Sequence, residues 1–252
     1  MTARLVRTEI EVPGTPEEVW EAIATGPGIA CWFVPAEVDE RVGGEIVTHH
    51  GPYGDNRGVV TAWEPPRRFA YEEREWAEGA PPWATEILVG SRGGTCLVRL
   101  VSGVFSGGED WGDEIDGTEA GWRLGMENLR LYLTHFAGRR CSHALAVGVA
   151  GEPHERAWPA FAAALGVHGV GEGARVAGPV VSGVVERTLG EAVLLRDGDG
   201  IVEVYAHPGD GETHLAVRAY RFGGDAAAVA AREEPALRAW MGEHVAAAGA
   251  RG

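Results

Sequence analysis

Residues 116–138 constrain the fold more than any other part of this sequence. Five apolar residues recur there at alternating steps of four and three, the spacing that gathers side chains on one face of an α-helix: Trp122, Met126, Leu129, Leu133 and Phe136. Thr118 is a suitable N-cap and Gly138 a suitable residue just beyond the C-terminus. A helix of about 19 residues is roughly 28 Å long. Because its apolar face must be buried, the sequence predicts a long helix that crosses a sheet.

Polar and small residues flank this apolar face. Arg123 and Glu127 have the spacing of an i,i+4 ion pair. Gly121 and Gly125 lie four residues apart beside the apolar face. The simpler interpretation is that they allow close packing of the helix backbone, and the alternative is that they leave space for a ligand.

The residues before this helix are typical of strands and turns. Residues 6–12 alternate between apolar and charged side chains, which predicts a half-buried strand. Thr15 to Glu18 read Thr-Pro-Glu-Glu, the pattern of a capped helix start with a capping box. A second brief helix is expected around residues 29–33. Gly-Gly and Pro-Pro pairs then separate about six strands, among them residues 45–50, 58–63, 68–76, 85–89 and 95–102.

The order of these elements predicts an α+β fold. A curved antiparallel sheet wrapped around a long C-terminal helix buries its apolar face economically. The segments that carry this order are VPGTPEEVWEAI, CWFVPAEVDERVGGEIV, GVVTAWEPPRRFAYEEREW, GGTCLVRLVSGVF and GWRLGMENLRLYL.

In their order and spacing these segments resemble the SRPBCC (START-related, helix-grip) superfamily. Within it, they are most similar to the bacterial branch related to the activator of heat-shock-protein (Hsp) ATPase homologue family. The resemblance spans residues 3–138. It implies a helix-grip fold with a cavity, usually apolar, between the long helix and the concave face of the sheet. It implies no single activity, since members bind lipids and other hydrophobic molecules and some are cyclases or aromatases.

The second half of the chain repeats the pattern of the first in a shorter form. PHERAWPAF matches TPEEVWEAI, GVVERTLGEAVLLRDG matches GVVTAWEPPRRFAYEE, and GETHLAVRAYRF matches GGTCLVRLVSGVF. A helical run at residues 226–248 then takes the place of the long helix. The sequence predicts two tandem copies, a helix-grip domain at residues 1–138 and a degenerate helix-grip-like domain at 141–252. The alternative is that two unrelated meanders share such fragments by chance.

We expect the second copy to be a scaffold without a ligand site. Its terminal helix begins with small residues at 226–231, which would let the helix settle directly onto its sheet. Packed interiors tolerate few voids larger than a water molecule.

Composition limits the partners and the compartment. The net charge of −15 argues against nucleic acid or an anionic membrane as partner, because both require a basic patch. Cys31, Cys96 and Cys141 form no CxxC pair, as expected of free thiols in a reducing compartment. The N-terminal residues lack the apolar core of a signal peptide, and no apolar run is long enough to cross a membrane. A cytoplasmic location is therefore predicted.

The common catalytic and metal-binding motifs are missing from the sequence. His49 and His50 are adjacent on a predicted strand, so they point to opposite faces and cannot chelate one ion together. We find no phosphate-binding loop and no nucleophile elbow. The sequence predicts no catalytic residue, no metal ion and no cofactor.

Aromatic residues are the main candidates for a binding site. Nine tryptophans is a high number for this length, and several lie beside strand ends, where the mouth of a cavity would be. The predicted ligand-binding residues are Trp32, Phe33, His49, Tyr71, Trp76, Trp83, Phe105, Trp122, Gly125, Met126 and Leu129.

Three functions fit these observations. The first is non-catalytic binding of a small hydrophobic molecule in the N-terminal copy. The second is a cyclase- or aromatase-like enzyme with His49, Tyr71 or Glu73 as acid or base. Such an enzyme needs a buried histidine or carboxylate beside a second titratable group. The third is an interaction module that binds a chaperone or forms a homodimer, which would show an exposed apolar patch.

Overall fold

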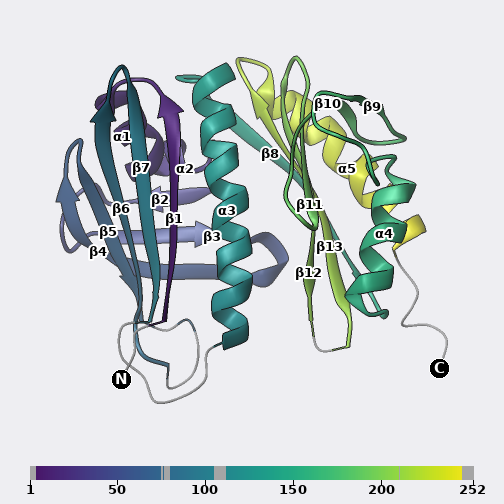
Figure 1. The fold of residues 1–252 in the computed structure, drawn as a ribbon, viewed down its shortest axis with the longest axis horizontal. Coiled ribbons are helices and arrows are strands. Elements are labelled where there is room, and N and C mark those ends of the chain that lie inside the picture. The colour runs from purple at the N-terminus through teal and green to yellow at the C-terminus, as the bar shows by residue number, and fades with distance from the viewer. Residues whose placement is uncertain (1–3, 75, 77–79, 105–111, 210, 246–252) are drawn as a thin grey trace. The chain divides into compact units, whose positions relative to one another are not determined.

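The computed structural model describes residues 4–74, 76, 80–104, 112–209 and 211–245, with residues 112–116 described by their backbone alone. The chain divides into two compact units, Met1–Gly138 and Arg139–Gly252. Each unit contains one antiparallel sheet and ends in a long helix (Figure 1). The predicted α+β helix-grip class is confirmed.

The first unit forms a sheet whose first strand pairs with its last. Its sheet order is β1-β7-β6-β5-β4-β3-β2, with every neighbouring pair antiparallel. Helix α3 lies closest to β1 (Figure 1). In chain order the elements are β1 (Arg4–Pro13), α1 (Pro16–Ala24), α2 (Gly26–Ile29), β2 (Ala36–Val38), β3 (Glu45–His49), the 3-10 helix η1 (Gly51–Tyr53), β4 (Asp55–Glu64), β5 (Arg68–Glu73), β6 (Trp83–Arg92), β7 (Thr95–Val104) and α3 (Gly112–His135).

Threonine caps fix the two short helices. The predicted capping box of α1 is present: Glu18 N donates to Thr15 Oγ1, and Thr15 N donates to Glu18 Oε2. Thr25 caps α2 in turn, since its Oγ1 accepts from Gly28 N at 3.1 Å. Helix α2 therefore starts right after Thr25, before the predicted range of 29–33.

Helix α3 confirms the predicted apolar face and corrects its start. The five residues of that face are buried, with exposed fractions of 0 to 7%: Trp122, Met126, Leu129, Leu133 and Phe136. The predicted N-cap at Thr118 is wrong, because the helix already begins at Gly112. Gly138 has a φ of +72°, as expected just beyond a helix end.

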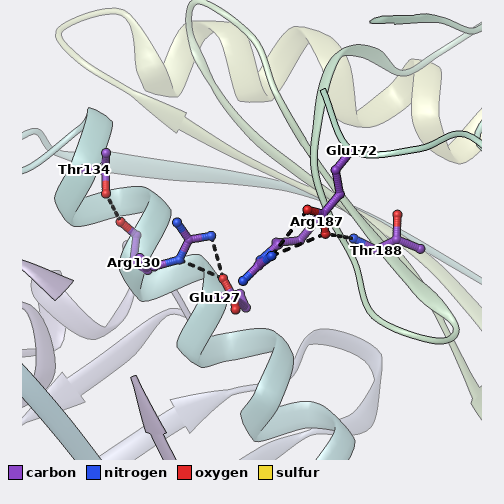
Figure 2. A network of polar contacts seen from close by, with 6 residues as sticks. All are labelled: Glu127, Arg130, Thr134, Glu172, Arg187 and Thr188. Atoms are coloured by element: carbon purple, nitrogen blue, oxygen red, sulfur yellow. Dashed lines mark hydrogen bonds and ion pairs between the residues drawn. The ribbon is translucent and has the colours of Figure 1, made fainter. Parts of the chain in front are cut away.

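Glu127 pairs one turn further along α3 than the sequence suggested. Its Oε2 accepts from Arg130 Nη2 at 2.7 Å and from Arg130 Nε at 2.9 Å (Figure 2). Thr134 Oγ1 donates to the Arg130 carbonyl oxygen. The i,i+3 partner thus takes the place of the predicted i,i+4 partner Arg123.

The second unit repeats the order of elements with a smaller sheet, of order β8-β13-β12-β11-β10-β9. Here too the first strand pairs with the last, and the terminal helix α5 packs on β8 and β13. The shared order is in keeping with the predicted tandem duplication, which stays a prediction. The elements are β8 (Cys141–Ala150), α4 (His154–Ala164), β9 (Arg175–Ala177), β10 (Ser182–Thr188), β11 (Ala192–Arg196), β12 (Gly200–Pro208), β13 (Thr213–Phe222) and α5 (Ala226–His244).

A loop-to-strand contact holds the irregular segment before β9 in the second unit. Glu172 accepts from Arg187 Nη1 at 3.3 Å and from the backbone N of Thr188 (Figure 2). Helix α5 is seated tightly on β8 at Gly148, where an added Cβ would lie 2.7 Å from Val245. A cavity of about 140 Å³ lies beside α5 and is partly open, because Pro179 and Ala236 in its lining are exposed, so the expected close fit of the helix stays a prediction.

The close approach of α1 and α2 can be tested at Gly28. A Cβ on Gly28 would lie 1.8 Å from the Glu21 carbonyl oxygen. We expect Gly28→Ala to lower the free energy of unfolding by about 2 kcal/mol or more. Gly121→Ala is the control, since its Cβ would meet no described atom within 4 Å; it should add up to about 1 kcal/mol. Urea unfolding measures both, and equal stabilities would contradict the packing described.

Candidate functional site

Three hydroxyl side chains cross the middle of the first sheet on its buried face. Tyr71 on β5 lies opposite Thr85 on β6, which lies opposite Ser102 on β7. Directly opposed residues share a face of the sheet. Thr85 Oγ1 and Ser102 Oγ are 2.8 Å apart, and the three residues are between 0 and 6% exposed. We call Tyr71, Thr85 and Ser102 the polar row.

Two tryptophans lie at the end of the polar row. Trp83 Nε1 donates to Ser102 Oγ at 2.8 Å. The ring of Trp76 meets that of Trp83 edge-on, with centroids 5.2 Å apart, and Trp76 Nε1 donates to the Pro81 carbonyl oxygen. The hydrogen bonds of Ser102 thus hold the indole of Trp83 in one orientation on the buried face of the sheet.

Glu73 is the charged group of this face. It follows Tyr71 by two residues and therefore points to the same side of β5. Burial raises the pKa of Glu73 to about 7. Burial, and then the nearby Glu73 charge, raise the pKa of Tyr71 as well. Among the described residues the Glu73 carboxylate has no hydrogen-bond or ion-pair partner. A carboxylate that titrates near neutral pH beside a tyrosine is a common feature of functional sites.

A glycine lies opposite Glu73 on the neighbouring strand. Gly58 on β4 contributes no side chain beside the carboxylate, and its position is closely packed, since an added Cβ would lie 2.9 Å from the Glu72 carbonyl oxygen and 3.1 Å from Ile46 Cγ2. The sequence named Glu73 as an acid or base but left it out of the predicted binding residues. The alternation from Phe69 through Tyr71 to Glu73 could have placed it on the buried face, because Phe69 is wholly buried.

A second group of aromatic side chains joins α3 to the segment after α2. Trp32 is 1% exposed, and its Nε1 donates to the Ala22 carbonyl oxygen at 2.9 Å. Phe33 stacks on Trp122 with centroids 5.0 Å apart and an interplanar angle of 19°. A Cβ on Gly125 would lie 3.4 Å from the Trp32 ring. At Gly125 the structure therefore favours close packing over empty space.

The structure divides the predicted residues into two groups and leaves two outside them. Tyr71, Trp76 and Trp83 accompany the polar row. The α3 group contains Trp32, Phe33, Trp122 and Gly125, followed along the helix by the buried Met126 and Leu129. Phe105 lies outside the described residues.

His49 is not brought to this face. It points to the outer side of β3, where its Nδ1 is 2.8 Å from Asp55 Oδ1 and its Nε2 is 3.7 Å from Glu37 Oε1. His50 takes the inner side, with its ring edge-on to Phe33 and its Nε2 3.1 Å from Thr48 Oγ1. The expected opposition of the two histidines is confirmed, and the inner one is His50.

The described part of the chain has neither a metal-binding cluster nor a membrane-spanning helix. Within it, no cluster of three or more His, Cys, Asp or Glu side chains could hold a metal ion. None of its helices is both long and apolar enough to span a membrane.

Comparison with known proteins agrees with the fold of the first unit. Residues 13–134 match the family described as Activator of Hsp90 ATPase homolog 1-like protein (AHSA1). No curated protein matches the sequence.

Several solved structures are similar to the chain. CalU16 from Micromonospora echinospora is 23% identical over 52% of this chain and 77% of its own, with a TM-score of 0.44. The Aha1 dimer from Colwellia psychrerythraea is 17% identical over 52% of this chain and 96% of its own, with a TM-score of 0.44. DynU16, from the dynemicin biosynthetic locus, is 17% identical over 94% of both chains, with a TM-score of 0.46.

The raised pKa of Glu73 predicts a pH-dependent stability. Between pH 4.5 and 7 the unfolded chain releases a proton that the folded protein keeps, so this group's contribution to stability falls as pH rises through about 7. Glu73→Gln removes this loss. Since one pKa unit corresponds to about 1.4 kcal/mol, the variant should be more stable than the wild type by about 3 kcal/mol at pH 8, with a much smaller difference at pH 4.

Urea unfolding of both proteins at the two pH values measures this difference. Glu72→Gln is the matched control, because Glu72 lies on the opposite face of β5 and pairs with Arg74. An equal gain in the two variants at pH 8 would show that burial of Glu73 is not its cause.

Proposed function

We propose that the first unit binds a small hydrophobic molecule, because this unit belongs to the family of activator of Hsp90 ATPase homolog 1-like proteins. The ligand would lie between α3 and the concave face of the sheet and leave chemically unchanged. The observation that carries the proposal is the polar row, set in an apolar face beside Glu73, whose carboxylate has no partner among the described residues.

Apolar side chains supply the hydrophobic part of the proposed site. On the concave face Phe69, Ile87 and Leu100 flank the polar row, each at most 3% exposed. On α3, Met126 and Leu129 belong to the buried apolar face. Ligand sites typically combine such walls with a few polar groups that fix orientation.

The polar groups specify what the ligand should carry. A buried carboxylate without a partner is costly, and a donor on the ligand would offset that cost. Glu73 can accept from a hydroxyl or amide of the ligand when ionised, and the Tyr71 hydroxyl can donate to a carbonyl or hydroxyl oxygen. We therefore expect a mainly apolar molecule with at least one hydroxyl or amide group.

A second candidate function is acid–base catalysis on such a ligand. It is favoured by one observation, the pKa of Glu73 of about 7, which suits a group that both gives and takes a proton near neutral pH. Tyr71 is the second titratable group that such an enzyme requires. His49 gives no support to this function, because it lies on the outer face.

Binding can be tested with a pair of probes that differ by one hydroxyl, 1-naphthol and naphthalene. We expect the wild type to prefer 1-naphthol, and Tyr71→Phe to weaken 1-naphthol binding about fivefold while leaving naphthalene binding unchanged. Tyr53→Phe is the matched control, since Tyr53 is 53% exposed on η1. Tryptophan fluorescence titration measures all three proteins. Failure of the wild type to bind either probe would contradict the proposal.

The two candidate functions differ in the fate of the ligand. Mass spectrometry of molecules retained by the purified protein identifies a natural ligand, which is then incubated with the wild type and with Glu73→Gln. Binding without chemistry leaves its mass and isomeric form unchanged in both. A change that the wild type causes and Glu73→Gln does not would establish the catalytic function instead.

A further inference from the structure

The second unit contains a cavity of about 140 Å³ that the first unit's proposed site does not involve. It lies beside α5, over β12 and β13, is bordered on another side by the segment before β10, and is partly open to solvent, since Pro179 and Ala236 in its lining are exposed. Its lining is mostly apolar and consists of Pro179, Val180, Val202, Ala219, Arg221, Glu233, Ala236 and Leu237.

Helix α5 leaves this space because it fits its sheet unevenly. Near its C-terminus, Met241 and Val245 press against the bare backbone of Gly148. Closer to its start, Pro235 interrupts the helical hydrogen bonding just before the two α5 residues that line the cavity, Ala236 and Leu237. Ala219 and Ala236 are too small to fill the gap.

The polar wall of the cavity is a buried ion network. Arg221 Nε donates to Glu233 Oε2 at 2.6 Å, and Arg221 Nη1 donates to Asp197 Oδ2 at 2.7 Å. The Arg221 side chain is 8% exposed. Each of the two residues keeps one polar atom available: within the described residues, neither Arg221 Nη2 nor Glu233 Oε1 has a hydrogen-bond partner. Arg221 and Glu233 therefore offer one donor and one acceptor.

Size and charge together select a ligand class. An apolar cavity of about 150 Å³ accommodates benzene, so this one suits a single aromatic ring. Two carboxylates around one guanidinium leave a net negative charge, which disfavours an anionic ligand. A neutral hydroxyl or carboxamide can accept from Nη2 and donate to Oε1 at once.

We propose that the cavity between α5 and strands β12 and β13 is a second ligand site, which binds a neutral single-ring aromatic molecule through Arg221 and Glu233. This site is independent of the proposed function of the first unit. With this site, the second unit would be a binding domain with a preference for neutral aromatic ligands and not the scaffold that the sequence predicts.

The full-length chain tests this with 4-fluorophenol followed by fluorine NMR, and with 4-fluorobenzoate as the anionic counterpart. We expect the phenol to bind at least tenfold more tightly than the benzoate. Ala236→Leu should fill the cavity and weaken phenol binding at least tenfold. Ala239→Leu is the matched control, an exposed alanine on the same helix that does not line the cavity, and it should leave the affinity unchanged.

Glu233→Gln tests the polar wall. It removes one negative charge and keeps an acceptor, so phenol binding should change less than threefold, whereas benzoate binding should improve at least fivefold. A preference for phenol that Glu233→Gln leaves unaltered would overturn the assignment of Glu233.

Amide shifts in the wild type keep the test independent of how the variants fold. On addition of 4-fluorophenol, the largest proton–nitrogen shifts should fall at Val180, Ala219 and Leu237. Shifts confined to the first unit, or equal binding by wild type and Ala236→Leu, would overturn the proposal.

Discussion

The pairing of β1 with β7 is the contact on which the first unit depends. These strands run antiparallel in unbroken register from Arg4 opposite Val104 to Pro13 opposite Thr95. Because the first strand completes the sheet beside the last, the other six strands, β2 to β7, form one continuous meander. The chain leaves β7 beside β1, and α3 then returns along β1 over the apolar face. A sheet with one buried face needs such a cover, and here the last helix of the unit supplies it. The pairing of β8 with β13 gives the second unit the same plan.

Much of this plan could be predicted because it depends on local patterns. The apolar spacing of α3 identified its buried face residue by residue, and the Thr15 capping box located the start of α1. Turn residues separated the strands of the meander. Local patterns failed where two signals competed. The acidic residues before Thr118 read as a loop but belong to the helix, and Thr25 started α2 earlier than the apolar residues suggested.

The candidate site was harder to predict because it depends on the face to which each strand residue points. The sequence established that His49 and His50 oppose each other, but it gave no sign of which was inside, since His49 is the last residue of β3 and His50 follows it directly. Cross-strand register decides this: His49 lies opposite the exposed Asp55. Register also creates the polar row, whose members are separated by many residues in the chain. The cavity in the second unit escaped prediction for another reason. Small residues at the start of α5 suggested a close fit along the helix, but the cavity lies beside Ala236 and Leu237, which follow Pro235 further along it.

The two units bury charge in different ways, and the difference has consequences for how each responds to its surroundings. Arg221 is surrounded by two carboxylates, and these partners keep its pKa raised, so its charge is fixed over the whole physiological range. The electrostatic field that Arg221 exerts on a ligand beside it therefore does not change with pH. Ligands at this site are selected by their own charge and shape. Glu73 has no such partner among the described residues, and burial brings its pKa to about 7. Its charge therefore depends on pH and on any hydrogen-bond donor placed against it, because a donor stabilises the ionised form. A ligand that donates to Glu73 lowers that pKa and releases a proton when it binds near neutral pH. Of the two proposed sites, that of the first unit is thus the one in which ligand binding would be coupled to protonation.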